Sequence, residues 1–337
     1  MTSVFVSGAT GFIAQHVVKD LLAKNYTVIG SVRSASKGDH LAELLGSKKF
    51  SYEVVEDIEK EGAFDAALEK HPEVSVFLHT ASPFHFKATD NEKELLLPAV
   101  NGTKNAFRAI QLHGKNVTNV VLTSSYAAVG TASKDANKDE VINEESWNEI
   151  TWEEALKDPV SGYRGSKTFA EKAAWEFLKE NNPKFVLSVV NPTFVFGPQA
   201  FDSEVKDSLN TSSEVINALL KSGANGVVPP VKGGFVDVRD VSSAHITAFE
   251  KEAAYGQRLI LNSTRFTAQE IVDILNKRFP ELVGKIPVGE PGTGPSLRAN
   301  NATIDNTKTK KILGVSEFIG LEKSVVDSVS QILRTRK

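Results

Sequence analysis

The N-terminal segment constrains the fold more than any other part of this chain. Val4–Ser7 is a short apolar run, typical of a buried strand, and the glycine-rich stretch Gly8-Ala-Thr-Gly-Phe-Ile-Ala14 follows it at once. Apolar residues then recur at helical spacing: Ile13, Val17, Val18, Leu21 and Leu22. Strand, glycine turn and helix in this order allow a pyrophosphate to approach the backbone at the positive end of the helix. The spacing is G-x-x-G-x-x-A rather than G-x-G-x-x-G, and a plain glycine turn is the alternative. The flanking elements favour a dinucleotide site.

The end of the next strand indicates which dinucleotide. Thr27–Val32 is predicted as a strand, and proteins that prefer NAD usually carry Asp or Glu near its end to bind the ribose 2′-hydroxyl. Here Arg33 follows, with Lys37 close behind. An arginine can pair with a 2′-phosphate and stack on adenine. The sequence therefore predicts NADPH/NADP+ as cofactor, the alternative being a surface arginine in a loop.

The rest of the first half keeps the same rhythm. Further strands are predicted at Ser51–Val55, Val74–Leu78, Asn119–Thr123 and Phe185–Val190, with helical segments between them. Such alternation predicts an α/β fold of the Rossmann type, in which a doubly wound parallel sheet is covered on both faces. Ligands in such folds sit beyond the carboxyl ends of the strands. Five candidate residues fall at those ends: Gly8, Arg33, Asp57, Ala81 and Ser125.

The pattern weakens after Pro198. Helices are expected over 205–220, 266–279 and 322–333, and a short strand from Phe235 runs into another helix. We therefore expect an NADP(H)-binding Rossmann domain over 1–198 and a smaller substrate-binding lobe over 199–337, with some elements crossing back. The polar segment 131–159 is expected to be a long loop with a short helix.

Tyr163 and Lys167 stand four positions apart in a segment with helical periodicity, so they share one face of a helix. An ammonium group one turn from a phenol favours the phenolate and is expected to lower the phenol pKa. A phenol tuned in this way can give a proton to a developing alkoxide. Taken alone, the pair is a weak signal, and a solvated helix face is the favoured interpretation.

Composition excludes several classes of function. The net charge of -3 gives no reason to expect nucleic acid or an anionic membrane. The absence of cysteine excludes disulfides, thiol nucleophiles and cysteine-ligated metals. His79 and His85 lack a third partner at metal-ligand spacing, so no metal is expected. No Lys or Arg precedes Lys19 and no apolar run is long enough to span a bilayer, so a cytoplasmic protein is expected. A homodimer is left open.

Six ordered motifs together resemble the extended short-chain dehydrogenase/reductase family over nearly the whole chain. They are Gly8–Ala14, His79-Thr-Ala-Ser-Pro83, Asn101-Gly-Thr103, Leu122-Thr-Ser-Ser-Tyr126, Tyr163-Arg-Gly-Ser-Lys167 and Asn191-Pro-Thr-Phe-Val-Phe-Gly-Pro198. Within that family the chain resembles the dihydroflavonol-reductase-like branch, and most closely the yeast NADPH-dependent methylglyoxal/isovaleraldehyde reductases. The stretches Thr123–Val129 and Phe169–Phe177 carry this closer match.

The resemblance implies roles for individual residues. Ser125 is expected to bind the substrate carbonyl, Tyr163 to donate the proton, and Lys167 to hold the nicotinamide ribose. Asn101 matches the asparagine that supports a proton relay in related enzymes. The implied cofactor contacts are Ser7, Gly8, Thr10, Gly11, Phe12, Ile13, Arg33, Lys37, Asp57, Ile58, Thr80, Ala81, Ser82, Tyr163, Lys167, Pro192, Val195 and Ser212.

The expected reaction is hydride transfer from NADPH to an aldehyde or ketone. Aromatic residues near the expected cleft predict an apolar substrate pocket: Phe84, Phe86, Tyr126, Phe194 and Phe201. Ordinary core packing is the alternative for some of them. Two other functions stay open. A nucleotide-sugar epimerase or dihydroflavonol reductase shares the fold, although Arg33 argues against the NAD that epimerases prefer. A non-catalytic NADP(H)-binding regulator is the other, although such proteins tend to lose the Ser/Tyr/Lys set.

Overall fold

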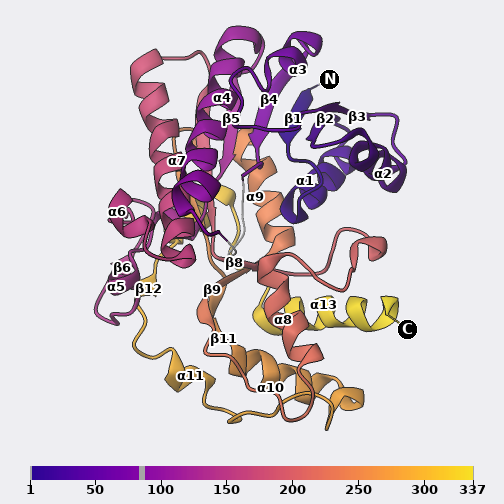
Figure 1. The fold of residues 1–337 in the computed structure, drawn as a ribbon, viewed down its shortest axis with the longest axis vertical. Coiled ribbons are helices and arrows are strands. Elements are labelled where there is room, and N and C mark those ends of the chain that lie inside the picture. Colours follow the sequence, from indigo (N-terminus) through magenta and orange to yellow (C-terminus); the bar gives the residue numbers. More distant parts are fainter. Residues whose placement is uncertain (1, 83–87, 337) are drawn as a thin grey trace. The chain divides into compact units, whose positions relative to one another are not determined.

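The computed structural model describes residues 2–82 and 88–336 (Figure 1). The chain forms two compact units. Unit 1 comprises Met1–Thr131, Glu144–Asn191 and Ser242–Leu259, and unit 2 comprises Ala132–Asn143, Pro192–Val241 and Ile260–Lys337. The chain leaves unit 1 for Ala132–Asn143, leaves it again at Pro192 and returns for Ser242–Leu259. That return is fixed by contacts such as the 2.6 Å hydrogen bond between Thr123 Oγ1 and His245 Nε2.

Unit 1 is built on a seven-stranded sheet of order β10-β7-β5-β4-β1-β2-β3. Its strands are β1 (Ser3–Ser7), β2 (Thr27–Val32), β3 (Phe50–Val54), β4 (Val74–His79), β5 (Asn119–Thr123), β7 (Val186–Pro192) and β10 (Arg258–Leu261). Neighbouring strands from β3 to β7 pair in parallel. The Rossmann-type sheet predicted from the strand and helix rhythm is confirmed, and β2 and β5 have the predicted bounds.

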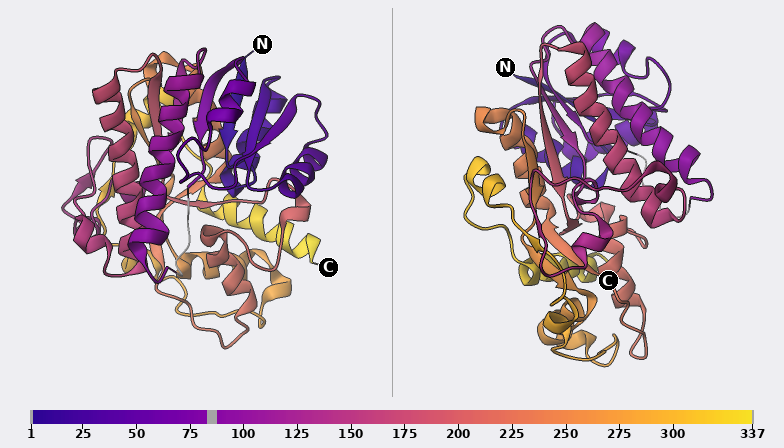
Figure 2. Two further views of the ribbon diagram at one scale, coloured as in Figure 1. Left: turned by 45° about the horizontal axis from the view of Figure 1, so that its top comes forward. Right: turned by 90° about the vertical axis from the view of Figure 1, so that its left-hand side faces the viewer.

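The helices of this unit pack against the sheet or against one another. They are α1 (Phe12–Ala23), α2 (Ala35–Leu45), α3 (Asp65–Lys70), the π-helical η1 (Glu92–Leu96), α4 (Leu97–His113), the short 3-10 helices η2 (Tyr126–Ala128) and η4 (Glu252–Ala254), α6 (Trp152–Ala155), α7 (Pro159–Asn181) and α9 (Val238–Glu250). Both views of Figure 2 show α4 and α7 running side by side, and the two helices pack closely. Burial of Phe5, Phe77, Phe107 and Leu187 makes one continuous core here.

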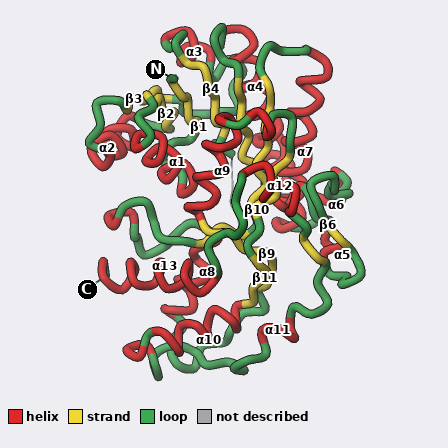
Figure 3. Tube along the Cα trace, turned by 180° about the vertical axis from the view of Figure 1, so that it is seen from behind, coloured by secondary structure: helices red, strands yellow, loops and turns green. Residues whose placement is uncertain are grey.

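Unit 2 holds a three-stranded sheet of order β11-β9-β8 and a two-stranded one that pairs β12 with β6. Figure 3 shows β9 and β11 side by side, and they pair antiparallel. The elements are α5 (Ala132–Asp135), β6 (Val141–Ile142), β8 (Phe194–Phe196), η3 (Asp202–Glu204), α8 (Thr211–Lys221), β9 (Lys232–Asp237), β11 (Thr264–Thr267), α10 (Ala268–Arg278), η5 (Pro280–Leu282), α11 (Gly294–Leu297), β12 (Thr303–Ile304), α12 (Thr307–Leu313) and α13 (Leu321–Thr335).

Two of the helices expected in unit 2 start later than predicted. The segment expected as a helix from 266 begins as β11, and α10 starts only after Thr267, whose side chain caps it in a reciprocal pair with Glu270. Likewise α8 starts at Thr211 rather than 205, because the Leu209 N–H is bonded to Glu214 and the chain turns there. Local capping chemistry therefore sets these boundaries.

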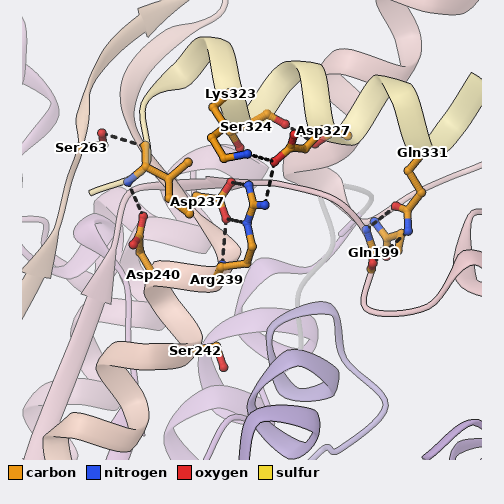
Figure 4. A network of polar contacts seen from close by, with 12 residues as sticks. Gln199, Asp237, Arg239, Asp240, Ser242, Ser263, Lys323, Ser324, Asp327 and Gln331 are labelled. Atoms are coloured by element: carbon orange, nitrogen blue, oxygen red, sulfur yellow. Dashed lines mark hydrogen bonds and ion pairs between the residues drawn. The ribbon is translucent and has the colours of Figure 1, made fainter. Parts of the chain in front are cut away.

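An ion-pair network ties β9 to the C-terminal helix of unit 2 (Figure 4). The Arg239 guanidinium donates to both oxygens of Asp237, each at 2.8 Å, and to Asp327 on α13 at 2.7 Å. Asp237 is fully buried, so its charge depends on this arginine. Lys323 reaches the same Asp327 oxygen at 2.9 Å from the exposed side of α13. Among the described residues, no helix is long and apolar enough to cross a membrane.

Candidate functional site

The hydroxyls of Tyr163 and Ser125 meet at the carboxyl end of β5. Helix α7 begins after Asp158, whose carboxylate accepts the N–H groups of Val160 and Ser161 and so fixes the first turn. The Tyr163 O–H donates to Ser125 Oγ at 3.1 Å. That oxygen also accepts the Ala127 N–H at 3.1 Å. Because Ser125 accepts both bonds, its own O–H proton is available to a carbonyl oxygen.

Burial sets the pKa values of the Tyr163 and Lys167 side chains. It raises the pKa of Tyr163, against the hydrogen bond with Ser125 and the charge of Arg164, which lower it. The expected net lowering is therefore wrong, because desolvation of the phenolate outweighs the nearby positive charge. Burial also lowers the pKa of Lys167 to about 8, against the charge of Glu171, which raises it. At neutral pH both groups still carry their protons.

Lys167 lies where the carboxyl ends of β4 and β5 approach α7. A small cavity of about 10 Å³ there is lined by His79, Ala81, Ser82, Thr103, Leu122, Thr123, Ser124, Lys167, Ala170 and Glu171. The arrangement brings Lys167 to the loop after β4, in which Thr80, Ala81 and Ser82 are expected to contact the cofactor. Asn101 is half-buried on α4, the helix that packs against α7.

The glycine turn after β1 fits a pyrophosphate. Gly8 has a φ of +66°, and a Cβ there would lie 3.1 Å from Cα and Cβ of Ala81. The loops after β1 and β4 therefore approach closely, at the point where the strand order reverses. Helix α1 starts after Gly11 without a side-chain cap and without an acidic residue in its first turn. The first N–H groups of a helix have no partner within the helix, so those of Phe12 and Ile13 are suited to bind an anion.

Ser7 holds this turn together from inside. Its Oγ accepts the N–H groups of Thr80 and Ala81, each at 3.0 Å, and lies 3.0 Å from His79 Nδ1. Burial lowers the pKa of His79 to about 3, so the ring is neutral and Nδ1 accepts the Ser7 proton. Ser7 is itself fully buried. Its side chain thus ties β1 to β4 within the protein. The Thr10 carbonyl accepts a hydrogen bond from the Gln15 side-chain amide on α1 at 3.1 Å.

The cationic residues expected at the 2′-phosphate follow β2 and are exposed. The part of the chain that the structure describes provides neither the Arg33 nor the Lys37 side chain with a hydrogen bond or an ion pair. Asp57 and Ile58 follow β3, where Asp57 accepts the Glu59 N–H at 2.9 Å. Ile58 packs so closely on α4 that a Cβ at Gly102 would lie 2.7 Å from its Cδ1. The expected adenine and phosphate contacts therefore line the same strand ends.

The remaining expected residues divide between the units. Tyr126 in unit 1 is 8% exposed and covers Gly130. In unit 2, Phe194 on β8 packs against Phe266 with ring centroids 5.4 Å apart, and Phe201 is half-buried. Three expected cofactor contacts are also found in unit 2: Pro192 at the end of β7, Val195 on β8 and Ser212 on α8. Phe84 and Phe86 lie outside the described residues. The aromatic substrate pocket stays a prediction.

The sequence reading missed a buried carboxylate behind Lys167. Glu171 is fully buried and bonds to Ser124, Asn191 and Arg258. Helical spacing could have indicated it, because a residue four positions after Lys167 lies on the same face of the helix. Arg258 carries no such signal, because its strand was not predicted. Among the described residues, no group of three acidic or histidine side chains could hold a metal ion.

Similarity to known proteins is strong over the full length. Residues 4–262 match the NAD dependent epimerase/dehydratase family. The chain is 54% identical to the putative NADPH-dependent methylglyoxal reductase of Candida albicans over 98% of both chains. The crystal structure of Candida albicans Gre2 in complex with NADPH matches with a TM-score of 0.98 and 60% identity, covering 100% of both chains. Yeast methylglyoxal/isovaleraldehyde reductase Gre2, complexed with NADPH, matches with a TM-score of 0.97 and 52% identity over 99% of each chain.

Proposed function

Because this chain belongs to the NAD dependent epimerase/dehydratase family, we propose that it is an NADPH-dependent carbonyl reductase that converts small aldehydes and ketones to alcohols. The observation that carries the proposal is the Tyr163 hydroxyl 3.1 Å from Ser125 Oγ, on α7 with Lys167 one turn away. The names of the relatives support methylglyoxal and isovaleraldehyde as substrates.

The described residues fit NADPH. The uncapped start of α1 and the Gly8 turn would bind the pyrophosphate, and Arg33 and Lys37 would bind the 2′-phosphate. Lys167 would hold the nicotinamide ribose. When bound, NADPH supplies the hydride that adds to the carbonyl carbon.

Residues of the chain bind and protonate the carbonyl oxygen. Ser125 donates its O–H proton to the substrate carbonyl in a hydrogen bond, which orients the carbonyl and stabilises negative charge on its oxygen. Tyr163 transfers its phenolic proton to that oxygen as charge develops. The raised pKa of Tyr163 keeps the phenol protonated before the reaction. The Lys167 ammonium stabilises the phenolate that results.

The substrate side is proposed to be apolar, with Tyr126 among its walls, because aromatic side chains favour aliphatic and aryl carbonyls over sugars. Asn101 on α4 is proposed to support proton return to Tyr163.

We also propose that the enzyme works in the cytoplasm, which the absence of cysteine supports. Light scattering on the purified protein distinguishes a homodimer from a monomer.

Loss of NADPH absorbance tests the function directly. The purified protein is given methylglyoxal, isovaleraldehyde, an aryl ketone, a dihydroflavonol and a UDP-sugar, with NADH in parallel. We expect turnover of the small carbonyls with NADPH and much weaker turnover with NADH. Tyr163→Phe should lower kcat by about 10²–10⁴-fold and leave NADPH binding intact. The matched control is Tyr255→Phe, which loses only a 3.0 Å bond to the Phe249 carbonyl. Tight NADPH binding without any turnover would instead support a regulator.

A further inference from the structure

A fully buried carboxylate lies on the same face of α7 as the proposed catalytic pair. Glu171 follows Lys167 by one turn and Tyr163 by two. Its Oε2 accepts the Ser124 hydroxyl at 2.6 Å and the Asn191 amide at 2.7 Å. Its Oε1 accepts Arg258 Nε at 2.6 Å. Both oxygens are thus engaged, so the carboxylate is held rigidly.

The partners of Glu171 stand at the ends of the two strands that carry the site. Ser124 follows β5 and immediately precedes Ser125. Asn191 is the second-last residue of β7, and its side-chain amide also donates to the Ser125 carbonyl at 3.1 Å. Glu171 therefore holds the Ser124 side chain directly and the Ser125 carbonyl through the Asn191 amide, while the Ser125 hydroxyl meets Tyr163 on the same helix as Glu171. These contacts form a closed ring from α7 through β5 and β7 and back to α7.

Arg258 balances the buried charge. It is 8% exposed and pairs with Glu171 as its only carboxylate among the described residues. Its Nη1 donates to the carbonyls of Glu144, at 3.0 Å, and of Ser146. The guanidinium also stacks on the Trp147 ring, 3.8 Å from its centroid. These bonds fix Arg258 from several directions, so the Glu171 carboxylate can stay charged without contact with water.

We infer that Glu171 and Arg258 are positioning residues for the proposed reduction: the buried carboxylate holds Ser125 against Tyr163 and keeps a negative charge beside Lys167. This inference rests on the proposed function for its catalytic consequence. The alternative is that the pair contributes to the fold alone.

The charge of Glu171 acts on Lys167 in a definite direction. Burial lowers the pKa of Lys167 and Glu171 raises it. Among the described residues, the other titratable groups near Lys167 are Tyr163 on the same helix, whose phenol is protonated, and His79 on β4, which is neutral. Arg258 on β10 reaches Lys167 only through Glu171. Removal of the Glu171 charge should therefore lower the Lys167 pKa further. The alkaline limb of the pH–rate profile should move to lower pH.

Glu171→Gln tests the inference, with Trp175→Phe as matched control. The glutamine keeps the size of the side chain and removes its charge. The control removes the 3.4 Å bond from Trp175 Nε1 to the same carboxylate and keeps an aromatic ring against the core cluster that Trp175 contacts. For Glu171→Gln we expect kcat to fall about 10-fold or more, because misplacement of the reacting groups is costly. The NADPH dissociation constant should stay within about threefold, because the interactions lost act on the reacting groups. The alkaline limb should shift by half a pH unit or more.

A second readout does not depend on turnover. The pKa of Lys167 is measured by NMR in lysine-labelled protein, with the signal assigned through its loss in Lys167→Arg. A lower pKa in Glu171→Gln than in wild type and Trp175→Phe is expected. If wild type reduces no carbonyl, the proposed function fails, and this titration still decides the electrostatic part of the inference.

The inference is overturned if Glu171→Gln differs from the control only in its melting temperature. Should Glu171→Gln fail to fold, Ser124→Ala removes one hydroxyl and leaves the ion pair intact. A lower kcat with unchanged NADPH binding is then expected for Ser124→Ala. Wild-type kcat in that variant would refute the positioning role.

Discussion

Replacement of Arg239 by methionine should destabilise the protein far more than loss of a typical ion pair. Asp237 is fully buried, and two of its hydrogen bonds come from the Arg239 side chain at 2.8 Å (Figure 4). Methionine fills the space of the arginine stem but leaves that carboxylate unpaired in the core. Removing one partner of a buried pair costs about 3–5 kcal/mol.

The lower end of this range applies, because Asp237 keeps one donor in any variant. The backbone N–H of residue 239 donates to Asp237 Oδ1 at 2.9 Å whatever the side chain is. We therefore expect a loss of about 3 kcal/mol. If all 337 residues unfold together, unfolding entropy of about 2.1 cal/mol/K per residue converts this loss to a fall in Tm of about 4 °C.

Thermal and urea unfolding followed by circular dichroism measure the effect. Lys323→Met is the matched control, because Lys323 reaches the same Asp327 oxygen from a side chain that is 63% exposed. Exposed pairs contribute about 0–1 kcal/mol, so the control should change little. Adding Asp237→Asn to Arg239→Met should recover part of the loss by removing the unpaired charge. Equal stabilities of the two single variants would refute the reasoning.

Three further outcomes follow from individual residues. Arg33→Ala should raise the KM for NADPH by about 10-fold or more and raise the KM for NADH much less, because the ionic contact that is lost goes to the 2′-phosphate, which NADH lacks; steady-state kinetics with both cofactors decide it, and an equal effect on both would contradict the assignment. Gly8→Ala should weaken NADPH binding in a fluorescence titration and cost about 1–2 kcal/mol in unfolding, because φ is +66° and the new Cβ meets Ala81; unchanged affinity would place the pyrophosphate elsewhere. Burial raises the pKa of Asp240 to about 6, so its contribution to stability is fully present below the unfolded pKa and is lost as pH rises through about 6. Asp240→Asn should therefore gain Tm relative to wild type between pH 4.5 and pH 8, and a constant difference would contradict this.

The parts of the fold that could be predicted from sequence are those with a strong local signal. The strand, glycine turn and helix at the N-terminus have this property, as do the strands Thr27–Val32 and Asn119–Thr123, whose bounds agree with the structure. Proximity of Ser125 and Tyr163 was also predictable, because α7 connects β5 to its parallel neighbour β7, so its first turns lie at the carboxyl ends of the strands, where ligands bind in such folds.

Other features depend on contacts between distant segments. β10 is four residues long and lies at the edge of the sheet. The next strand in the chain, β11, belongs to unit 2. Arg258 on that strand meets Glu171, 87 positions earlier in the chain. No periodicity links two such residues. The direction of the Tyr163 pKa shift was missed for a related reason: spacing reveals the nearby lysine but not the depth of burial.

Burial acts on the two groups of the proposed site with opposite chemical consequences. It favours the neutral form of each, so the Tyr163 phenol keeps the proton it is proposed to donate, whereas Lys167 tends to lose the charge it is proposed to use. A desolvated site that stabilises one group thus weakens the other. Glu171 offsets part of this effect, because its charge is one turn from Lys167 and raises the lysine pKa against the larger effect of burial. A buried carboxylate at that position is therefore what a dry phenol-and-ammonium site requires near neutral pH.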